Sequence, residues 1–191
     1  MKYVSIDLET TGLDEETCQT IEIGAVIDDT SHKTPIDQLP TFHCYVTHPI
    51  YCGEPFALSM HADIFKKLSD RPEGWRYETI DSVANVFQAW IAKHFEEPAT
   101  IAGKNFMGYD MNFLKKIPQF QRNQFKHRCI DPAMLFWDRK NDTELPNLKT
   151  CMERAGIPGE VTHTALEDAF QVIKLLRYEK ADMPVLAEDV G

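Results

Sequence analysis

Two carboxylates near the start of the chain have the residue type and spacing that a divalent cation requires. Asp7 and Glu9 alternate within residues 6–12, so a β-strand would place both on one face, about 7 Å apart along the chain. Like charges at this spacing repel, and a hard cation such as Mg²⁺, which prefers carboxylate oxygen, would relieve that repulsion. Two solvated acids at a strand edge are the alternative. Because Asp7 ends an otherwise apolar segment, we favour the metal site.

Two further clusters carry residues that do chemistry. Asp110 follows a short apolar segment and a glycine-containing turn, so it falls in the first turn of an expected helix, where α/β sheets commonly build sites. The helix macrodipole alone would also favour an acid there, and Asn105 would serve equally as a turn residue. Asp168 lies just over one turn inside the last expected helix, and His163 lies just outside its start. This arrangement suits a general base beside a metal ligand, although a lone His163 is more often a surface residue.

Length and charge indicate one globular domain. The chain has 191 residues, 43% of them hydrophobic, which is enough for one core and short for two full domains. We therefore expect a single domain over residues 1–191. The formal net charge of −10 has the wrong sign for holding long duplexes through counterion release. Carboxylates gathered around metal ions would contribute to that charge, so a nucleic-acid substrate is not excluded.

The sequence contains no signal for export or for a membrane. Met1 and Lys2 lead directly into an apolar strand-like segment, and no apolar run approaches the length of a membrane span. The five cysteines form neither a CxxC pair nor a Cys/His run with zinc spacing, and an odd number cannot all pair internally. We expect reduced thiols, a cytoplasmic location and no membrane association.

The hydrophobic pattern of the first half predicts strands followed by a helix. Segments 3–8, 21–27 and 42–46 are rich in β-branched and aromatic residues. Their short separations favour an antiparallel arrangement, with the polar segment 28–40 as a protruding hairpin connection. Apolar residues then recur with a helical period over 83–95, which predicts an amphipathic helix.

Shorter elements in the second half complete the expected sheet. Strands at 100–102 and 128–130, with a helix over 109–116 between them, indicate parallel crossovers. Thr164 and Glu167 predict a capping box at the start of the last helix. The expected fold is α/β, with a mixed five-stranded sheet of three antiparallel and two parallel strands flanked by helices.

Taken together, the three clusters resemble the motifs of the DEDDh (DnaQ-like) 3′–5′ exonuclease family, which has a ribonuclease H-like fold. The order and spacing match over nearly the whole chain, and the family includes proofreading subunits of DNA polymerases, RNase T and oligoribonuclease. His163 five positions before Asp168 separates the chain from the sister group, which carries tyrosine four positions before. Two departures bear on substrate contacts. Lys104 stands where histidine is frequent, and Asp110 is five residues after Asn105, as in oligoribonuclease-like sequences.

The resemblance implies a two-metal phosphodiester hydrolase. Two divalent ions, Mg²⁺ or Mn²⁺, would be held by four carboxylates, and a histidine would accept a proton from the attacking water. The five catalytic residues would be Asp7, Glu9, Asp110, His163 and Asp168.

The resemblance also implies contacts with the 3′ end of a single-stranded nucleic acid. Thr10, Thr11 and Leu13 would hold the terminal nucleotide through backbone groups and an apolar contact with its base. Phe106 and Tyr109 would be available to stack on bases, although aromatic residues at a helix start more often pack inward. The remaining substrate-binding candidates are Asn105 and His61.

The predicted function is a metal-dependent 3′–5′ exonuclease that releases nucleoside 5′-monophosphates from single-stranded DNA ends. One alternative keeps the fold and acts on short RNA, which the acidic composition and the oligoribonuclease-like spacing favour. A second is a non-catalytic module that docks to a polymerase or another replication or repair protein. Filled catalytic positions argue against it. A third, an unrelated acidic α/β interaction protein, would bind no divalent ion.

Overall fold

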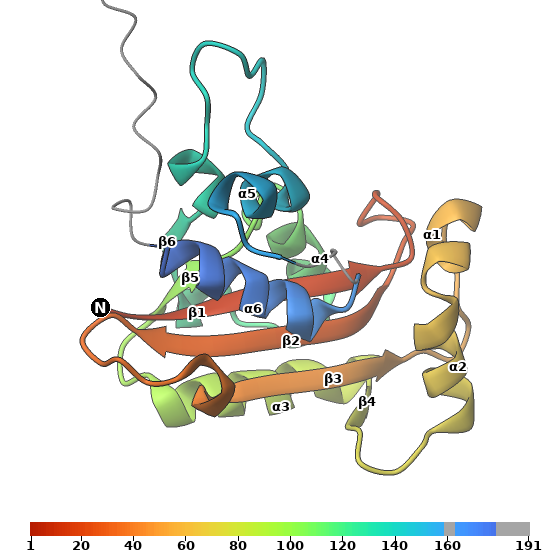
Figure 1. Cartoon of the computed structure of the whole chain (residues 1–191). Helices are drawn as coiled ribbons and strands as arrows, with labels where there is room; N and C mark the ends of the chain where they lie inside the picture. Colours follow the sequence, from red (N-terminus) through yellow and green to blue (C-terminus); the bar gives the residue numbers. More distant parts are fainter. Residues whose placement is uncertain (159–162, 179–191) are drawn as a thin grey trace, which may run out of the picture.

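A six-stranded mixed sheet forms the centre of the structure (Figure 1). The computed structural model describes residues 1–158 and 163–178. Three long strands, β1 (Lys2–Thr10), β2 (Thr20–Asp29) and β3 (Thr41–Thr47), pair antiparallel. This confirms the predicted antiparallel arrangement and the hairpin connection between the second and third strands.

Three shorter strands extend the sheet on both sides. β5 (Ala99–Ala102) pairs in parallel with β1, and β6 (Phe125–Ile130) pairs in parallel with β5, as predicted. β4 (Tyr77–Thr79) pairs in parallel with β3 at the other edge, which gives the order β4-β3-β2-β1-β5-β6. Its three residues lead directly into a helix and are too few for an alternating pattern to show. The predicted count of five strands is therefore wrong by one edge strand, while the α/β class is confirmed.

Six α-helices and three short 3-10 helices are present among the described residues. They are α1 (Pro55–Met60), α2 (Ala62–Asp70), α3 (Ile80–His94), α4 (Asp110–Lys116), α5 (Leu148–Ala155), α6 (Ala165–Leu176), η1 (Ile36–Gln38), η2 (Arg122–Gln124) and η3 (Pro132–Leu135). Helices α3, α4 and α6 confirm the predicted ones. Within residues 1–158 and 163–178, no helix combines the length and apolar character of a membrane span. All five cysteines are free thiols.

The two faces of the sheet have different tasks. Val4, Ile6 and Leu8 of β1 are buried in the main core, which α3 covers. Because side chains alternate along a strand, Asp7 and Glu9 point to the other face, where α6 lies across β1 and β2 (Figure 1). One strand therefore contributes to the core and presents the acids to α6.

Close packing of α6 on β2 depends on Gly24. A Cβ atom built on Gly24 would lie 2.1 Å from the carbonyl carbon of Ala165 and 2.1 Å from the amide nitrogen of Leu166. The absence of a side chain lets the helix backbone contact the strand backbone directly. Gly24 thus sets the distance between the sheet and the first turn of α6.

The start of α6 differs from the prediction in one respect. Thr164 is the N-cap residue as expected, but its side chain makes no capping hydrogen bond, so the Thr164 half of the capping box predicted with Glu167 is wrong. The backbone N–H of Ala165 instead donates to Oε2 of Glu22 on β2, at 3.1 Å. A distant carboxylate fixes the helix start, and local sequence cannot reveal such a partner.

Replacing Gly24 by alanine should destabilise the fold. The added Cβ meets backbone atoms, which cannot rotate away, and overpacking of this kind costs about 1–3 kcal/mol. Urea unfolding of the variant measures the loss. Gly108→Ala is the matched control, because its Cβ would meet the side chain of Asn105 at 2.7 Å, and that side chain can turn aside. Equal unfolding free energies for the wild type and Gly24→Ala would contradict the direct contact.

Candidate active site

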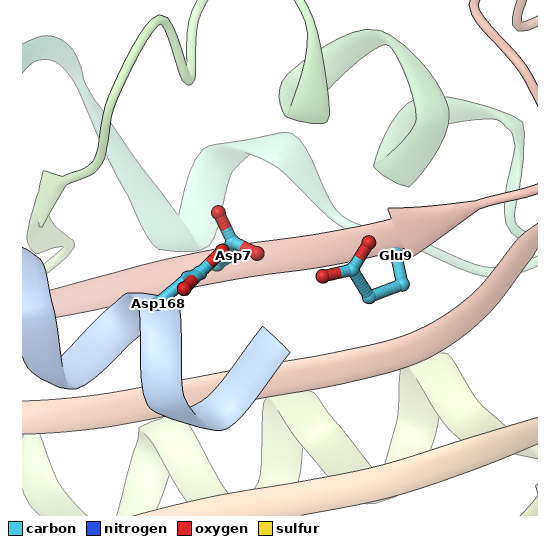
Figure 2. Close-up of side chains that lie close together, drawn as sticks. All are labelled: Asp7, Glu9 and Asp168. Carbon is cyan, nitrogen blue, oxygen red and sulfur yellow. The ribbon is translucent and has the colours of Figure 1, made fainter. Parts of the chain in front are cut away.

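Three carboxylates from opposite ends of the chain meet between β1 and α6. Asp7 and Glu9 come from β1, and Asp168 comes from the first turn of α6. One oxygen from each lies within 4.8 Å of the others. Figure 2 shows the three side chains gathered in the space between the strand and the helix. The predicted convergence of the first and third sequence clusters is therefore present in the structure.

The fourth predicted carboxylate, Asp110, is the first residue of α4. Its Oδ1 accepts the backbone N–H of Leu8 at 3.1 Å, a bond that ties the start of α4 to β1. Among neighbouring charges, that of Asp110 raises the pKa of Asp7 the most. Asp110 lies outside the tight group of three, but it lines the same cavity as Asp7 and Asp168.

Burial and mutual repulsion make the ionised carboxylates unfavourable. Burial raises the pKa of Asp7 well above its ordinary value, and the charges of the neighbouring acids add to that effect. Burial, followed by the charges of Glu22 and Asp168, raises the pKa of Glu9 to about 9. Burial is also the main reason why the pKa of Asp168 rises to about 7. Such a cluster requires protons or cations to be stable.

The donor set fits a hard divalent cation. All three side chains offer carboxylate oxygen, which is the ligand that Mg²⁺ and Mn²⁺ prefer. Oδ1 of Asp168 is buried and has no hydrogen-bond partner among the residues that the structure describes, and a buried oxygen of this kind is suited to an ion or a water molecule. No other group of three possible ligands occurs in the described parts of the chain.

His163 lies at the mouth of the same site. Its side chain is exposed and lines the cavity with Asp7 and Asp168. Its backbone has a positive φ of 52°, an uncommon conformation for a residue other than glycine. The sequence prediction placed a histidine just outside the helix start, and the structure places it there.

His61 is a partner of Glu9. Its Nε2 lies 3.3 Å from Oε2 of Glu9, and its side chain is buried. Burial lowers the pKa of His61, and so does the charge of nearby His163. A neutral imidazole that donates to Glu9 would fix the orientation of that carboxylate. Contact between His61 and a substrate stays a prediction.

The threonines at the end of β1 and directly after it build the turn. The hydroxyl of Thr11 donates to the Cys52 carbonyl at 2.6 Å, and its N–H donates to the Gln19 carbonyl at 2.9 Å. Thr10 is buried and bonds to the Tyr109 hydroxyl. Leu13, by contrast, is 74% exposed. Of the residues expected to hold the terminal nucleotide, Leu13 has the surface that a base needs.

The two aromatic candidates differ in exposure. Phe106 is 1% exposed and packs in the main core, so its predicted stacking on bases is wrong. Tyr109 is half-buried and lines the cavity, and its hydroxyl donates to the Gly12 carbonyl at 2.9 Å. Asn105 has a φ of 53°, and its carbonyl accepts the N–H groups of residues 108 and 109. This favours the interpretation of Asn105 as a turn residue.

The cavity over the carboxylates has a cationic wall. Its volume is about 680 Å³. Lys104 and Lys149 line it on the side formed by the loop before α4 and by the first turn of α5. Nζ of Lys104 also lies 4.0 Å from Oδ2 of Asp131. Acids and cations therefore face one space, which suits a phosphodiester that approaches metal ions.

Sequence reasoning missed two residues beside the acids, one of them fully buried. Glu22 is fully buried on β2, opposite Glu9 in the strand register. His43 on β3 contacts it, with Nε2 at 2.5 Å from Oε1 of Glu22. The available signal was a charged residue inside the apolar run 21–27, because an acid in a central strand is costly without a partner.

Comparison with known proteins identifies the family of the chain. The sequence model of the exonuclease family (RNase T) matches residues 4–176. The chain belongs to the exonuclease family. The resemblance to DnaQ-like, ribonuclease H-like proteins is thereby confirmed. Membership supports a nuclease, a hydrolase of a family for which divalent-metal binding is general.

The chain covers different shares of the named relatives and solved structures that it resembles. An oligoribonuclease from Shewanella frigidimarina is 25% identical over 179 residues, which cover 93% of each chain. E. coli Exonuclease I in complex with a dT13 oligonucleotide is 15% identical, with a TM-score of 0.68 over 94% of this chain and 41% of that chain. The zinc-bound E. coli ExoI–ssDNA complex is 14% identical and gives 0.70 over 96% and 41%. The chain spans about two fifths of these nuclease structures, and the likeness establishes a shared fold.

The metal-free protein should lose stability as the pH rises. The folded pKa values of about 7 for Asp168 and about 9 for Glu9 exceed the value of about 4 for carboxyls in an unfolded chain. The folded state therefore holds protons that the unfolded state releases. This stabilisation is lost progressively above about pH 4 and is gone once the pH has risen through 7 for Asp168 and 9 for Glu9. Urea midpoints with a chelator, from pH 5 to 9, measure the trend.

Added Mg²⁺ or Mn²⁺ should reverse this loss, most strongly at high pH, where protons compete least for the oxygens. Asp168→Asn is the matched variant and should flatten the dependence without metal. A metal-free stability that rises between pH 5 and 9 would contradict the electrostatic description of the cluster.

Proposed function

We propose that this chain is a metal-dependent 3′–5′ exonuclease that removes nucleoside 5′-monophosphates from the 3′ ends of single-stranded DNA. The observation that carries the proposal is the meeting of Asp7, Glu9 and Asp168 in a chain of the exonuclease family. His163 and Asp110 line the same cavity, so every residue type that the chemistry needs is present. Residues 1–191 would act as one exonuclease domain.

The four carboxylates, Asp7, Glu9, Asp110 and Asp168, would hold two divalent ions. Such ions, when bound, activate a water molecule and stabilise charge on the leaving 3′ oxygen. The protein would hold the carboxylate oxygens together and would place His163 where an imidazole nitrogen accepts a proton from the attacking water. His61, kept neutral by burial, would hold the carboxylate of Glu9 in a productive orientation.

Short RNA is a second candidate substrate. The similarity to an oligoribonuclease over 93% of each chain supports it, as does the five-residue step from Asn105 to Asp110. A non-catalytic docking module is disfavoured, because the acids that a decayed copy would lose are present and assembled. A polymerase or another replication or repair protein as a partner stays a prediction.

The substrate strand would enter along the cationic wall and past Leu13. Lys104 and Lys149 line the same cavity as the carboxylates, and lysine ammonium groups bind phosphate as point charges. The exposed side chain of Leu13 would contact the terminal base.

Asp7→Asn should abolish nuclease activity and leave a folded protein. The substitution keeps the shape of the side chain but removes one of several buried charges that repel each other, so the metal-free variant should be at least as stable as the wild type. The measurement is digestion of short single strands of DNA and RNA, labelled at the 5′ or the 3′ end, with Mg²⁺ or Mn²⁺. The wild type should release the 3′ label as a mononucleotide and shorten the 5′-labelled strand stepwise.

Glu97→Gln, which changes an exposed acid in the segment between α3 and β5, is the control and should act like the wild type. Near-normal activity of Asp7→Asn would contradict the metal assignment. Faster digestion of RNA than of DNA would select the second candidate substrate.

Lys104→Ala and Lys149→Ala should each raise KM with little effect on kcat, because the lysines would contact phosphates in the ground state and the transition state alike. Each lost contact should reduce the slope of log affinity against log salt concentration by about 0.7 on single strands. The measurement is KM over a series of KCl concentrations. Lys93→Ala is the control, since Lys93 is exposed on α3, on the other face of the sheet. An unchanged slope in both variants would refute the phosphate wall.

A further inference from the structure

Glu22 is a fifth carboxylate beside the predicted four. It is 0% exposed, and it lies outside the group of possible metal ligands. We propose that Glu22 is a positioning residue, which holds the first turn of α6 and thereby places Asp168 and His163 at the metal site. This inference rests on the proposed exonuclease function.

Each carboxylate oxygen of Glu22 contacts a different element. Oε1 lies 2.5 Å from Nε2 of His43 on β3, and Oε2 accepts the backbone N–H of Ala165 at 3.1 Å. The carboxylate therefore connects the sheet to the first N–H group of α6. A negative charge at a helix N-terminus is also favoured by the helix dipole.

The bond to Ala165 lies close to both functional residues. Ala165 is two residues after His163 and three residues before Asp168, which is about 4.5 Å along a helix axis. Gly24, two residues further along the same face of β2, removes the side chain that would separate strand and helix. A shift at Ala165 would therefore move the base and a metal ligand together.

The opposite end of α6 supplies an internal comparison. Asp28, near the end of β2, accepts hydrogen bonds from Nη2 of Arg177 at 2.5 Å and from Nε at 2.9 Å. Arg177 is the C-cap residue of α6. One strand thus fastens each end of one helix through a buried acid. The bond between Asp28 and Arg177 lies at the end of α6 that is distant from Asp168. If Glu22 only stabilised the fold, replacing Glu22 and replacing Asp28 should have the same effect on activity.

The experiment compares Glu22→Ala, Glu22→Gln and Asp28→Asn for four properties. They are the urea unfolding midpoint, kcat and KM on a short single strand, and Mn²⁺ affinity from calorimetry without substrate. Glu22→Ala should lower kcat and Mn²⁺ affinity by about 10- to 100-fold, as is usual when a residue that orients metal ligands is lost. KM should change little. Asp28→Asn should lower the urea unfolding midpoint. Its kcat should stay within about threefold of the wild-type value, a change much smaller than the 10- to 100-fold loss expected for Glu22→Ala.

Glu22→Gln should recover most of the loss, because its amide oxygen still accepts the Ala165 N–H. If Glu22→Ala does not fold, Glu22→Gln and His43→Ala carry the test, and His43→Ala should show a smaller fall in the same properties. Equal losses of kcat in Glu22→Ala and Asp28→Asn, or wild-type Mn²⁺ affinity in Glu22→Ala, would overturn the positioning role. A wild-type protein with no metal-dependent digestion would refute the proposed function instead, and calorimetry would still report on Glu22.

Discussion

Repulsion among buried carboxylates is the constraint on which the rest of the structure depends. Asp7, Glu9 and Asp168 come within 4.8 Å of one another, in surroundings where burial already disfavours their charges. A protein gains nothing in folding stability from such an arrangement. The fold must therefore hold the acids together against a force that separates them until cations or protons neutralise them. This cost is the strongest physical argument that the cluster serves chemistry.

The fold meets this constraint by rigid contacts to two neighbouring strands. β1 carries two of the acids between residues that anchor it in the main core. α4 is tied to β1 by the bond from Leu8 to Asp110. α6 packs closely on β2 at Gly24, and two acids of β2, Glu22 and Asp28, bind the two ends of α6. The proposed function would thus depend on a strand that supplies none of the proposed metal ligands.

The sequence was informative where chemistry follows from local periodicity. Alternation along one strand placed Asp7 and Glu9 on one face. Helix-start signals placed Asp110 in a first turn and Asp168 just over one turn inside the last helix. It was uninformative where a partner is remote. The bond from Ala165 to Glu22 spans 143 residues, so a local capping box was predicted in its place. The prediction that Phe106 stacks on bases was wrong for a related reason. Whether an aromatic residue at a helix start is exposed depends on the core that packs against it, and Phe106 packs in the main core.

The most direct test is a crystal structure with Mn²⁺, whose anomalous scattering locates the ion independently of the protein atoms. The account predicts a peak in contact with carboxylate oxygens of Asp7, Glu9 and Asp168, with the side chains close to their positions in Figure 2. A cluster that stays empty at saturating Mn²⁺, or that binds the ion only after the first turn of α6 moves away from β2, would contradict it.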